Sequence, residues 1–248
     1  MSLVFGGKSP TATGGTILFK EGLRVHTFTA SSNFTPTVDM FVDIMLIGGG
    51  GNTGPSQGGN QASGGGGAGQ ILLTKFVKLN SGVPYPVSIG DVGSSTYFNS
   101  PGLNGVPVKS ASSGGQGALG QAASATSGSS NLVASGGGGA GWNSGSGGSG
   151  AGIFGVGFPG FNCPGNGAGT ATGGGGGAGS GGPGPGTSGG NGAPIGYFTL
   201  NPNDWVCYGG PGYGGPPPSR PGPSAYGSGI SGQPYPYPGT SGAAFIKY

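Results

Sequence analysis

Three glycines follow an apolar segment in a spacing that is typical of dinucleotide-binding turns. Gly49, Gly51 and Gly54 form G-x-G-x-x-G directly after VDIMLI, and in nucleotide-binding folds such a turn leads into a helix whose amino end holds the pyrophosphate. The residues that follow, PSQGGNQASGGGGAG, are too rich in glycine for that helix. The next acidic residue is Asp91, well beyond the expected position of a ribose ligand. We interpret the pattern as a consequence of glycine abundance.

Few other residues could carry chemistry. His26 is the only histidine, and Cys163 and Cys207 are not in C-x-x-C spacing, so a zinc site is not expected. The two cysteines could equally form a disulfide or remain free thiols. Asp39 and Asp43 lie four residues apart on one face of a predicted strand, but Ca²⁺ would need further oxygen ligands that the sequence does not identify. We therefore predict no catalytic residues, no metal site and no cofactor, and hence no enzyme.

The composition narrows the class of protein further. Glycine contributes 68 and proline 22 of the 248 residues, whereas charged residues make up only 5%. Eight basic and five acidic residues cannot build a phosphate-binding surface, so we expect no nucleic-acid partner. No apolar run reaches the roughly 18 residues that a membrane span requires, so we expect no membrane insertion.

Patterns typical of strands lie mainly in residues 25–109. The predicted strands are Val25–Ala30, Phe41–Leu46, Gln70–Leu79 and Tyr85–Gly90, with shorter pieces at Tyr97–Phe98 and Val106–Lys109. Turn residues at 33–36, 80–82 and 104–105 separate them. The last segment, 241–248, returns to strand character and is expected to pair with a strand of the 25–79 region. No convincing helix is found.

The body of the chain, residues 110–240, is almost uncharged and contains long glycine runs. With few side chains to bury, it must be stabilised by backbone hydrogen bonds and close backbone packing. We predict that runs such as 136–139 and 173–177 form extended threefold segments that bond to one another. The expected fold class is all-β and irregular: a small N-terminal β-sheet region and a glycine-rich bundle of polyproline or polyglycine II-type helices, closed by a C-terminal strand. The predicted units are 1–24 as a docking segment, 25–109, 110–240 and 241–248.

Aromatic residues interrupt the glycine runs of the body. Such side chains supply much of the binding energy at interfaces, although they could equally anchor the loops on glycine faces. The candidate receptor-binding residues are Trp142, Phe154, Phe158, Phe161, Trp205, Tyr208 and Tyr213.

The order of segments resembles the glycine-rich domain of bacteriophage tail-fibre and related virion proteins. FTASSNF is followed by VDMFVDIMLIGGGG, GQILLTKFVKL and YPVSIGDVG, then by the glycine-rich body and finally AAFIKY. The resemblance covers Val25 to Tyr248, with an additional Pro/Tyr-rich segment at Tyr208–Pro238. It implies a bundle of parallel glycine-rich helices whose end loops bind receptors on the host surface.

These observations together predict a structural and adhesive virion protein at or near a tail-fibre tip, outside the cell after release. The expected partners are other tail or fibre proteins and a host-surface protein or glycan, and a homo-oligomer is compatible with this assignment. The segment before Val25, which contains LVF and TILF, is the expected attachment to the particle. The alternatives are a purely structural component that cements a tail or capsid, and an ice-binding glycine-rich protein.

Overall fold

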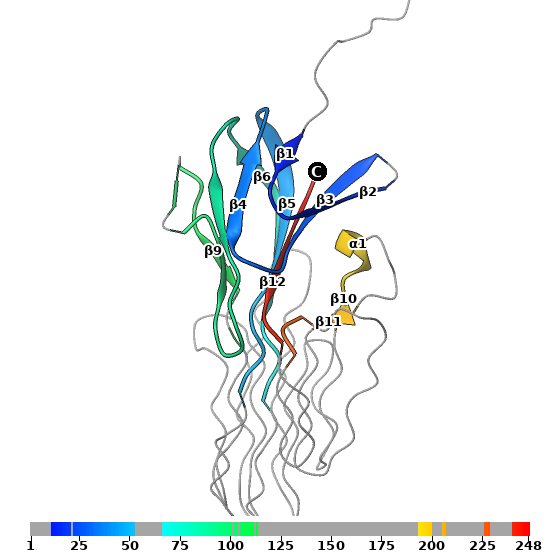
Figure 1. Cartoon of the computed structure of the whole chain (residues 1–248), viewed down its shortest axis with the longest axis vertical. Coiled ribbons are helices and arrows are strands. Elements are labelled where there is room, and N and C mark those ends of the chain that lie inside the picture. The colour runs from blue at the N-terminus through cyan, green and yellow to red at the C-terminus, as the bar shows by residue number, and fades with distance from the viewer. Residues whose placement is uncertain are drawn as a thin grey trace, which may run out of the picture.

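Two antiparallel sheets of five strands each pack face to face in the computed structural model (Figure 1). The structure describes residues 11–20, 22–52, 66–100, 102–103, 105–111, 113, 193–199, 205–206, 226–228 and 240–248. The all-β character predicted from the sequence is confirmed. Most of the predicted bundle, 110–240, lies outside the described residues, as do the glycine runs 136–139 and 173–177.

The first sheet has the strand order β1-β4-β7-β8-β9. Its strands are β1 (Ala12–Thr13), β4 (Ser32–Pro36), β7 (Tyr85–Ser88), β8 (Thr96–Phe98) and β9 (Lys109–Ala111). The second sheet has the order β2-β3-β12-β5-β6. Its strands are β2 (Thr16–Lys20), β3 (Leu23–Phe28), β12 (Ala243–Lys247), β5 (Met40–Ile47) and β6 (Ile71–Leu79).

The C-terminal strand β12 is the centre of the second sheet. It pairs antiparallel with β3, where Phe245 lies opposite Thr27, and with β5, where Phe245 lies opposite Met45. Tyr248 and Arg24 exchange two further backbone hydrogen bonds of 2.9 and 3.0 Å. The predicted pairing of the last segment with the 25–79 region is therefore confirmed.

The core between the two sheets consists of side chains that alternate along the strands. On β5, Val42, Ile44 and Leu46 point into it, and Phe34 and Phe98 meet them from the first sheet. Period-2 alternation places such residues on one face of a strand. Burial of large side chains in this cluster supplies hydrophobic stabilisation to the sandwich.

A second cluster covers the central part of the outer face of the second sheet. Met45 and Ile47 of β5 and Phe245 of β12 pack there against Phe198 and Val206. These last two residues belong to a small layer that comprises β10 (Ala193–Pro194), the single helical turn α1 (Gly196–Thr199) and β11 (Trp205–Val206). Because β12 lies at the centre of the second sheet, between the two clusters, all five of its residues are buried.

Several elements differ from the sequence-based expectations. Residues 33–36, predicted as a turn, lie in β4, because Phe34 is fully buried and pairs opposite Tyr85. The predicted docking segment 1–24 contains β1, β2 and the start of β3. The last strand of the 25–109 region is Lys109–Ala111 and not Val106–Lys109. The helical turn α1 was not predicted.

Candidate functional site

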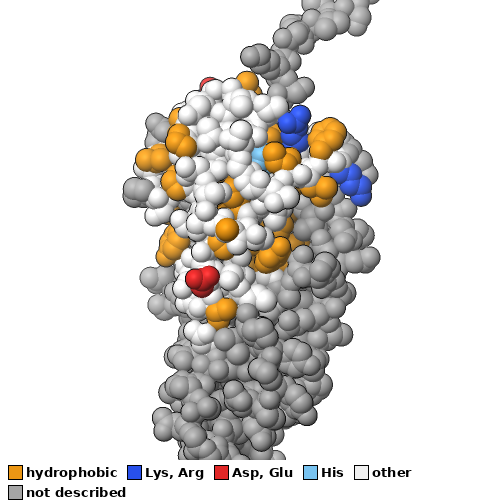
Figure 2. Space-filling model, in the orientation of Figure 1, with side chains coloured by type: hydrophobic (Ala, Val, Ile, Leu, Met, Phe, Trp, Pro, Cys, Tyr) orange, Lys and Arg blue, Asp and Glu red, His pale blue; other side chains and the backbone are white. Residues whose placement is uncertain are grey.

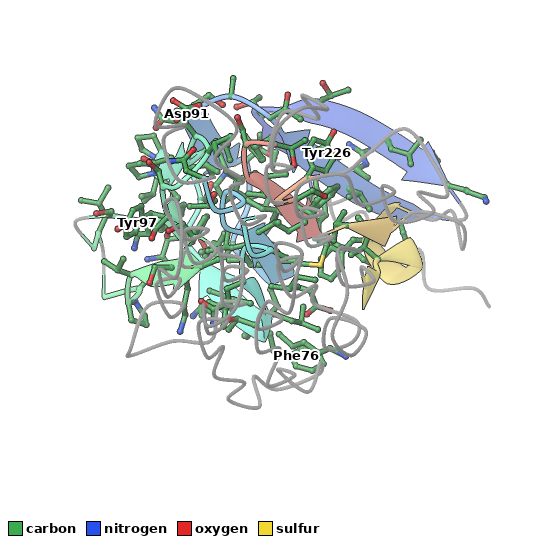
Figure 3. All side chains as sticks on the ribbon, turned by 90° about the horizontal axis from the view of Figure 1, so that it is seen from below. Phe76, Asp91, Tyr97 and Tyr226 are labelled. Carbon is green, nitrogen blue, oxygen red and sulfur yellow. The ribbon has the colours of Figure 1, made fainter. Side chains whose placement is uncertain are left out.

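Five glycine-rich stretches meet at one end of the two sheets and form what we call the glycine junction. They are residues 48–52, 66–70, 90–94, 226–228 and 240–242. Each directly continues or precedes a strand or turn of the described structure, and Figure 3 looks onto the sheets from this end. The sheets thus bring together segments that are up to about two hundred residues apart in the chain, as expected for long-range β pairing.

Four consecutive amides of the first stretch donate to carbonyls that belong to three other stretches of the junction. Gly48 donates to the carbonyl of Gln70 at 2.9 Å and Gly51 donates to that of Gly67 at 2.7 Å. Between them, Gly49 donates to Ser94 at 2.9 Å and Gly50 donates to Thr240 at 3.1 Å. The stretch is therefore held on several sides by other segments, a pattern that a flat β-ladder, with neighbours on two sides only, does not give.

The other stretches bond to one another in the same way. Gly69 donates to Gly227 at 2.8 Å, and Gly227 donates in turn to Ser241 at 3.0 Å. Gly242 donates to Gly90 at 2.8 Å, and Gly93 donates to Gly50 at 2.7 Å. The junction is a network between segments, which is the type of bonding that we predicted for the glycine runs of the body.

Only glycine fits several positions of the junction. A Cβ atom at Gly49 would lie 2.0 Å from the carbonyl oxygen of Asp91, and one at Gly66 would lie 2.0 Å from that of Gly51. A Cβ at Gly242 would lie 2.1 Å from the carbonyl oxygen of Ile47. Each neighbour is backbone, so it cannot move aside as a side chain could. The abundance of glycine at this end of the sheets therefore has a steric cause.

The first two glycines of the G-x-G-x-x-G pattern, Gly49 and Gly51, lie within the junction. The amides of Gly49 and Gly51 are already bonded to backbone carbonyls, so they cannot hold a phosphate in this structure. The third glycine, Gly54, lies outside the described residues. These bonds agree with our interpretation that the pattern is not a nucleotide site.

His26 is a packed residue of β3. Its Nδ1–H donates to the carbonyl of Gly14 at 2.6 Å, and its Nε2 accepts from the hydroxyl of Tyr248 at 3.0 Å. The ring of Phe34 meets it edge-on, with 5.1 Å between centroids. Burial lowers the pKa of His26 below its usual value. The hydrogen bond to Gly14 acts to raise this pKa, and the charge of Arg24 acts to lower it. The imidazole therefore serves as a neutral structural group.

The two aspartates bind backbone amides. Asp39 accepts from the amide of Ser81 at 2.8 Å and supports the turn between β6 and β7. Asp43 accepts from the amide of Phe76 at 3.1 Å and lies opposite Lys247 in the sheet. Among the described residues, no group of three His, Cys, Asp or Glu side chains is placed to hold a metal ion.

An exposed apolar edge lies on β2, at the border of the second sheet. All five of its residues are exposed, including Ile17, Leu18 and Phe19, whose ring is 64% exposed. The guanidinium of Arg24 lies 5.6 Å from the centroid of that ring. Figure 2 shows hydrophobic side chains over this edge, next to Lys and Arg side chains. Such an edge is able to pair with a further strand.

Of the seven predicted receptor-binding aromatics, Trp205 alone falls within the described residues. Trp205 lies in β11, where it pairs with Pro194, but its side chain is not described. The remaining six lie outside the described residues: Trp142, Phe154, Phe158, Phe161, Tyr208 and Tyr213. Their role stays a prediction.

Phe76 of β6 is an exposed aromatic residue that the sequence did not single out. Its side chain is 78% exposed, and its φ of 55° is unusual for a bulky residue. The segment QILLTKFVKL reads as a simple strand, so the sequence offers no signal for this conformation. The expected strand pattern was correct, but the local irregularity was missed.

The architecture is that of a β-sandwich domain with one end closed by glycine-rich segments. The family model of the glycine-rich domain matches residues 27–248, so the chain belongs to this family. Comparison with curated proteins gives no match. Strands β1 and β2 precede the matched residues. In the part of the chain that the structure describes, no helix is long and apolar enough to cross a membrane.

Proposed function

We propose that this protein is a non-enzymatic structural and adhesive component of a virion, at or near the tip of a bacteriophage tail fibre. Its glycine-rich body gives shape, and aromatic loops on that body attach the particle to a host-surface receptor. Its place is the exterior of the virion, and it is extracellular after release. The single observation that carries this proposal is the glycine junction, where stretches from across the chain are joined mainly by backbone hydrogen bonds, with further bonds that involve the side chains of Thr240 and Ser241.

The glycine junction supports a display role because most of the bonds that join its segments are between backbone groups. A Cβ atom at Gly49, Gly66 or Gly242 would overlap neighbouring backbone, so these positions present no side chain that could recognise a ligand. If the body continues in this way, recognition falls to the residues between its glycine runs. Those residues include the aromatics named from the sequence, which are the side chains best suited to an interface.

The exposed edge of β2 supports attachment to a neighbouring protein. An edge strand with Ile17, Leu18 and Phe19 in solvent is a liability unless a partner covers it. A strand from another tail or fibre subunit could add to this edge by backbone hydrogen bonds. Strand β2 (Thr16–Lys20) precedes residues 27–248, which match the family model, so this edge is not part of the matched domain.

Alanine substitutions of the body aromatics test the proposal. Particles carrying Trp142→Ala, Phe158→Ala, Trp205→Ala or Tyr208→Ala should assemble normally, because assembly depends on the backbone junction. Adsorption to host cells should fall by roughly tenfold or more for a true anchor. Tyr97→Ala is the matched control, since Tyr97 is an exposed aromatic of β8, and it should leave adsorption unchanged.

The same experiment separates adhesion from the structural alternative. If the aromatic substitutions block incorporation of the protein while the particles that form adsorb normally, these side chains are internal packing. The protein would then be a structural tail or capsid component, and the adhesive role would be wrong.

A further inference from the structure

The strand β6 contains an irregularity opposite Asp43. Val42 pairs with Val77 and Ile44 pairs with Thr74, so Lys75 and Phe76 together face one residue of β5. The carboxylate of Asp43 accepts a hydrogen bond from the amide of Phe76 at 3.1 Å and stabilises this β-bulge. The extra residue lets Leu73 and Leu79, which are six apart, pack on opposite faces of the sheet.

The bulge places a phenylalanine where glycine is expected. A bulge residue with positive φ is commonly glycine, because a Cβ atom makes this conformation costly. The other described residues with positive φ are eight glycines and Asn99. Asn99 is compensated by its side chain, which donates to the carbonyl of Val106 at 2.6 Å and accepts from the amide of Leu103 at 3.1 Å.

Phe76 has no such compensation from burial. Its ring is 78% exposed, so the side chain gains little from packing, although the chain uses glycine at 68 other positions. Strained and exposed residues that stability does not explain are candidates for function. Figure 3 shows the Phe76 ring at the periphery of the sheets, away from Asp91 and Tyr226.

A groove of about 370 Å³ lies beside this ring, between β6 and the segment that leads into β9. Its size is in the range of small-ligand sites. The lining comprises Thr74, Lys75, Phe76, Val77, Lys78, Gly105, Val106, Pro107 and Lys109. Three of these nine residues are lysines and none is acidic. The groove therefore combines positive charge with one exposed aromatic face.

We propose that this groove binds an acidic saccharide. The Phe76 ring stacks on the apolar face of a sugar, and the ammonium groups of Lys78 and Lys109 pair with its carboxylates. These two lysines come from different sheets, β6 and β9, and neither forms an ion pair within the described residues. The site belongs to the β-sandwich and is independent of the aromatic loops of the body, so it does not rest on the proposed host attachment.

The exposed ring beside the lysines favours a saccharide over small anions. A phosphate or a simple carboxylate would use the lysines but would leave the exposed ring without a role. A ring-shaped ligand that carries carboxylates at its rim uses both features of the groove. The charge pairing would be screened by salt, whereas the stacking would not.

Calorimetric titration of the full chain with a tetramer of galacturonic acid tests the proposal, with a neutral galactose tetramer as the comparison ligand. We expect the acidic tetramer to bind, more weakly as salt is raised, and the neutral tetramer to bind at least about tenfold more weakly. Phe76→Gly should weaken binding of the acidic tetramer by about tenfold or more. Because glycine favours positive φ, the same variant should unfold at an equal or higher denaturant concentration than the parent.

Matched variants on the opposite edge of the same sheet complete the design. Phe19→Ala and Lys20→Gln alter an exposed aromatic and a lysine of β2, and both should leave binding unchanged. Lys78→Gln and Lys109→Gln should each weaken binding and reduce its salt dependence. The proposal is overturned if the neutral tetramer or a glutamate tetrapeptide binds as tightly as the acidic tetramer. It is also overturned if Phe76→Gly binds like the parent, or if the parent binds no acidic tetramer.

Discussion

The two ends of the described structure are stabilised in opposite ways. In the β-sandwich, large side chains such as Phe34, Ile44 and Phe98 fill the space between two sheets. In the glycine junction, segments of backbone lie so close that a single methyl group at Gly49 would overlap a carbonyl oxygen. The first region depends on the volume of its side chains, and the second depends on their absence. We therefore expect the core of the sandwich to tolerate substitutions that change side-chain shape, and the glycine junction to tolerate no added side chain.

This contrast also explains how the chain combines the two regions. An isolated set of glycine segments loses much conformational entropy on ordering and buries little apolar surface. The sandwich supplies that burial and fixes the positions of β5, β6 and β12, from which three of the glycine stretches extend. The junction segments are therefore positioned by strands that side chains of the core hold in place.

The largest expected effect is that of a methyl group in the junction. Gly49→Ala brings a Cβ atom to 2.0 Å from the carbonyl oxygen of Asp91, which is backbone and cannot move aside. We expect a loss of about 3 kcal/mol in the free energy of unfolding, the upper end of the usual range for overpacking. The control is Gly105→Ala, where φ is 73° and nothing lies within 4 Å of the new atom. It should cost about 1–2 kcal/mol. Denaturant titration measures both, and equal losses would contradict the steric account.

A pair of changes three residues apart sharpens the comparison. Gly242→Ala adds one carbon at 2.1 Å from the carbonyl oxygen of Ile47, whereas Phe245→Leu removes part of a ring from the outer cluster. We expect Phe245→Leu to cost about 1–2 kcal/mol, because neighbouring side chains can partly fill the space. Gly242→Ala should cost more, as measured by the same titration. If Phe245→Leu costs more than Gly242→Ala, the backbone of the junction can shift to accommodate an added carbon, which contradicts the steric account.

The smallest expected effect is the pH dependence of the sandwich. Burial lowers the pKa of His26 in the folded state, so the unfolded chain takes up this proton first as pH falls. The stability that neutral His26 contributes should therefore be fully present above about pH 6.5. Below that pH the free energy of unfolding should decline by at most about 1.4 kcal/mol per pH unit, until the pKa of His26 in the folded state is passed. His26 is the only histidine. In His26→Gln, urea unfolding should lose this dependence between pH 5.5 and about 7; an unchanged slope would show that another group titrates.

Much of the sandwich could be predicted from the sequence. The alternation of apolar residues located β3, β5, β6 and β7, and the strand character of the last residues led to the correct pairing of β12. These features are visible because they are local and periodic. Strand β4 was read as a turn from Asn33 and Pro36, although burial of Phe34 keeps it extended. Burial depends on contacts with distant residues, which local turn preferences do not include.

The candidate sites were less predictable. Glycine stretches carry no side-chain pattern, so the sequence indicates that they bond to one another but not which amide meets which carbonyl. The bulge at Phe76 is equally hidden, because it depends on the pairing of β6 with Asp43 of β5. The aromatics of the body, such as Trp142 and Tyr208, were chosen by residue type alone and remain predictions.

Amide hydrogen exchange of the first glycine stretch tests the central claim most directly. The amides of Gly48, Gly49, Gly50 and Gly51 are bonded to carbonyls of other segments. Measured by NMR on the full chain, these four amides should be protected to a degree similar to those of β5, because both open only when the sheet end separates. Exchange as fast as in an unstructured peptide, while β5 stays protected, would contradict the account.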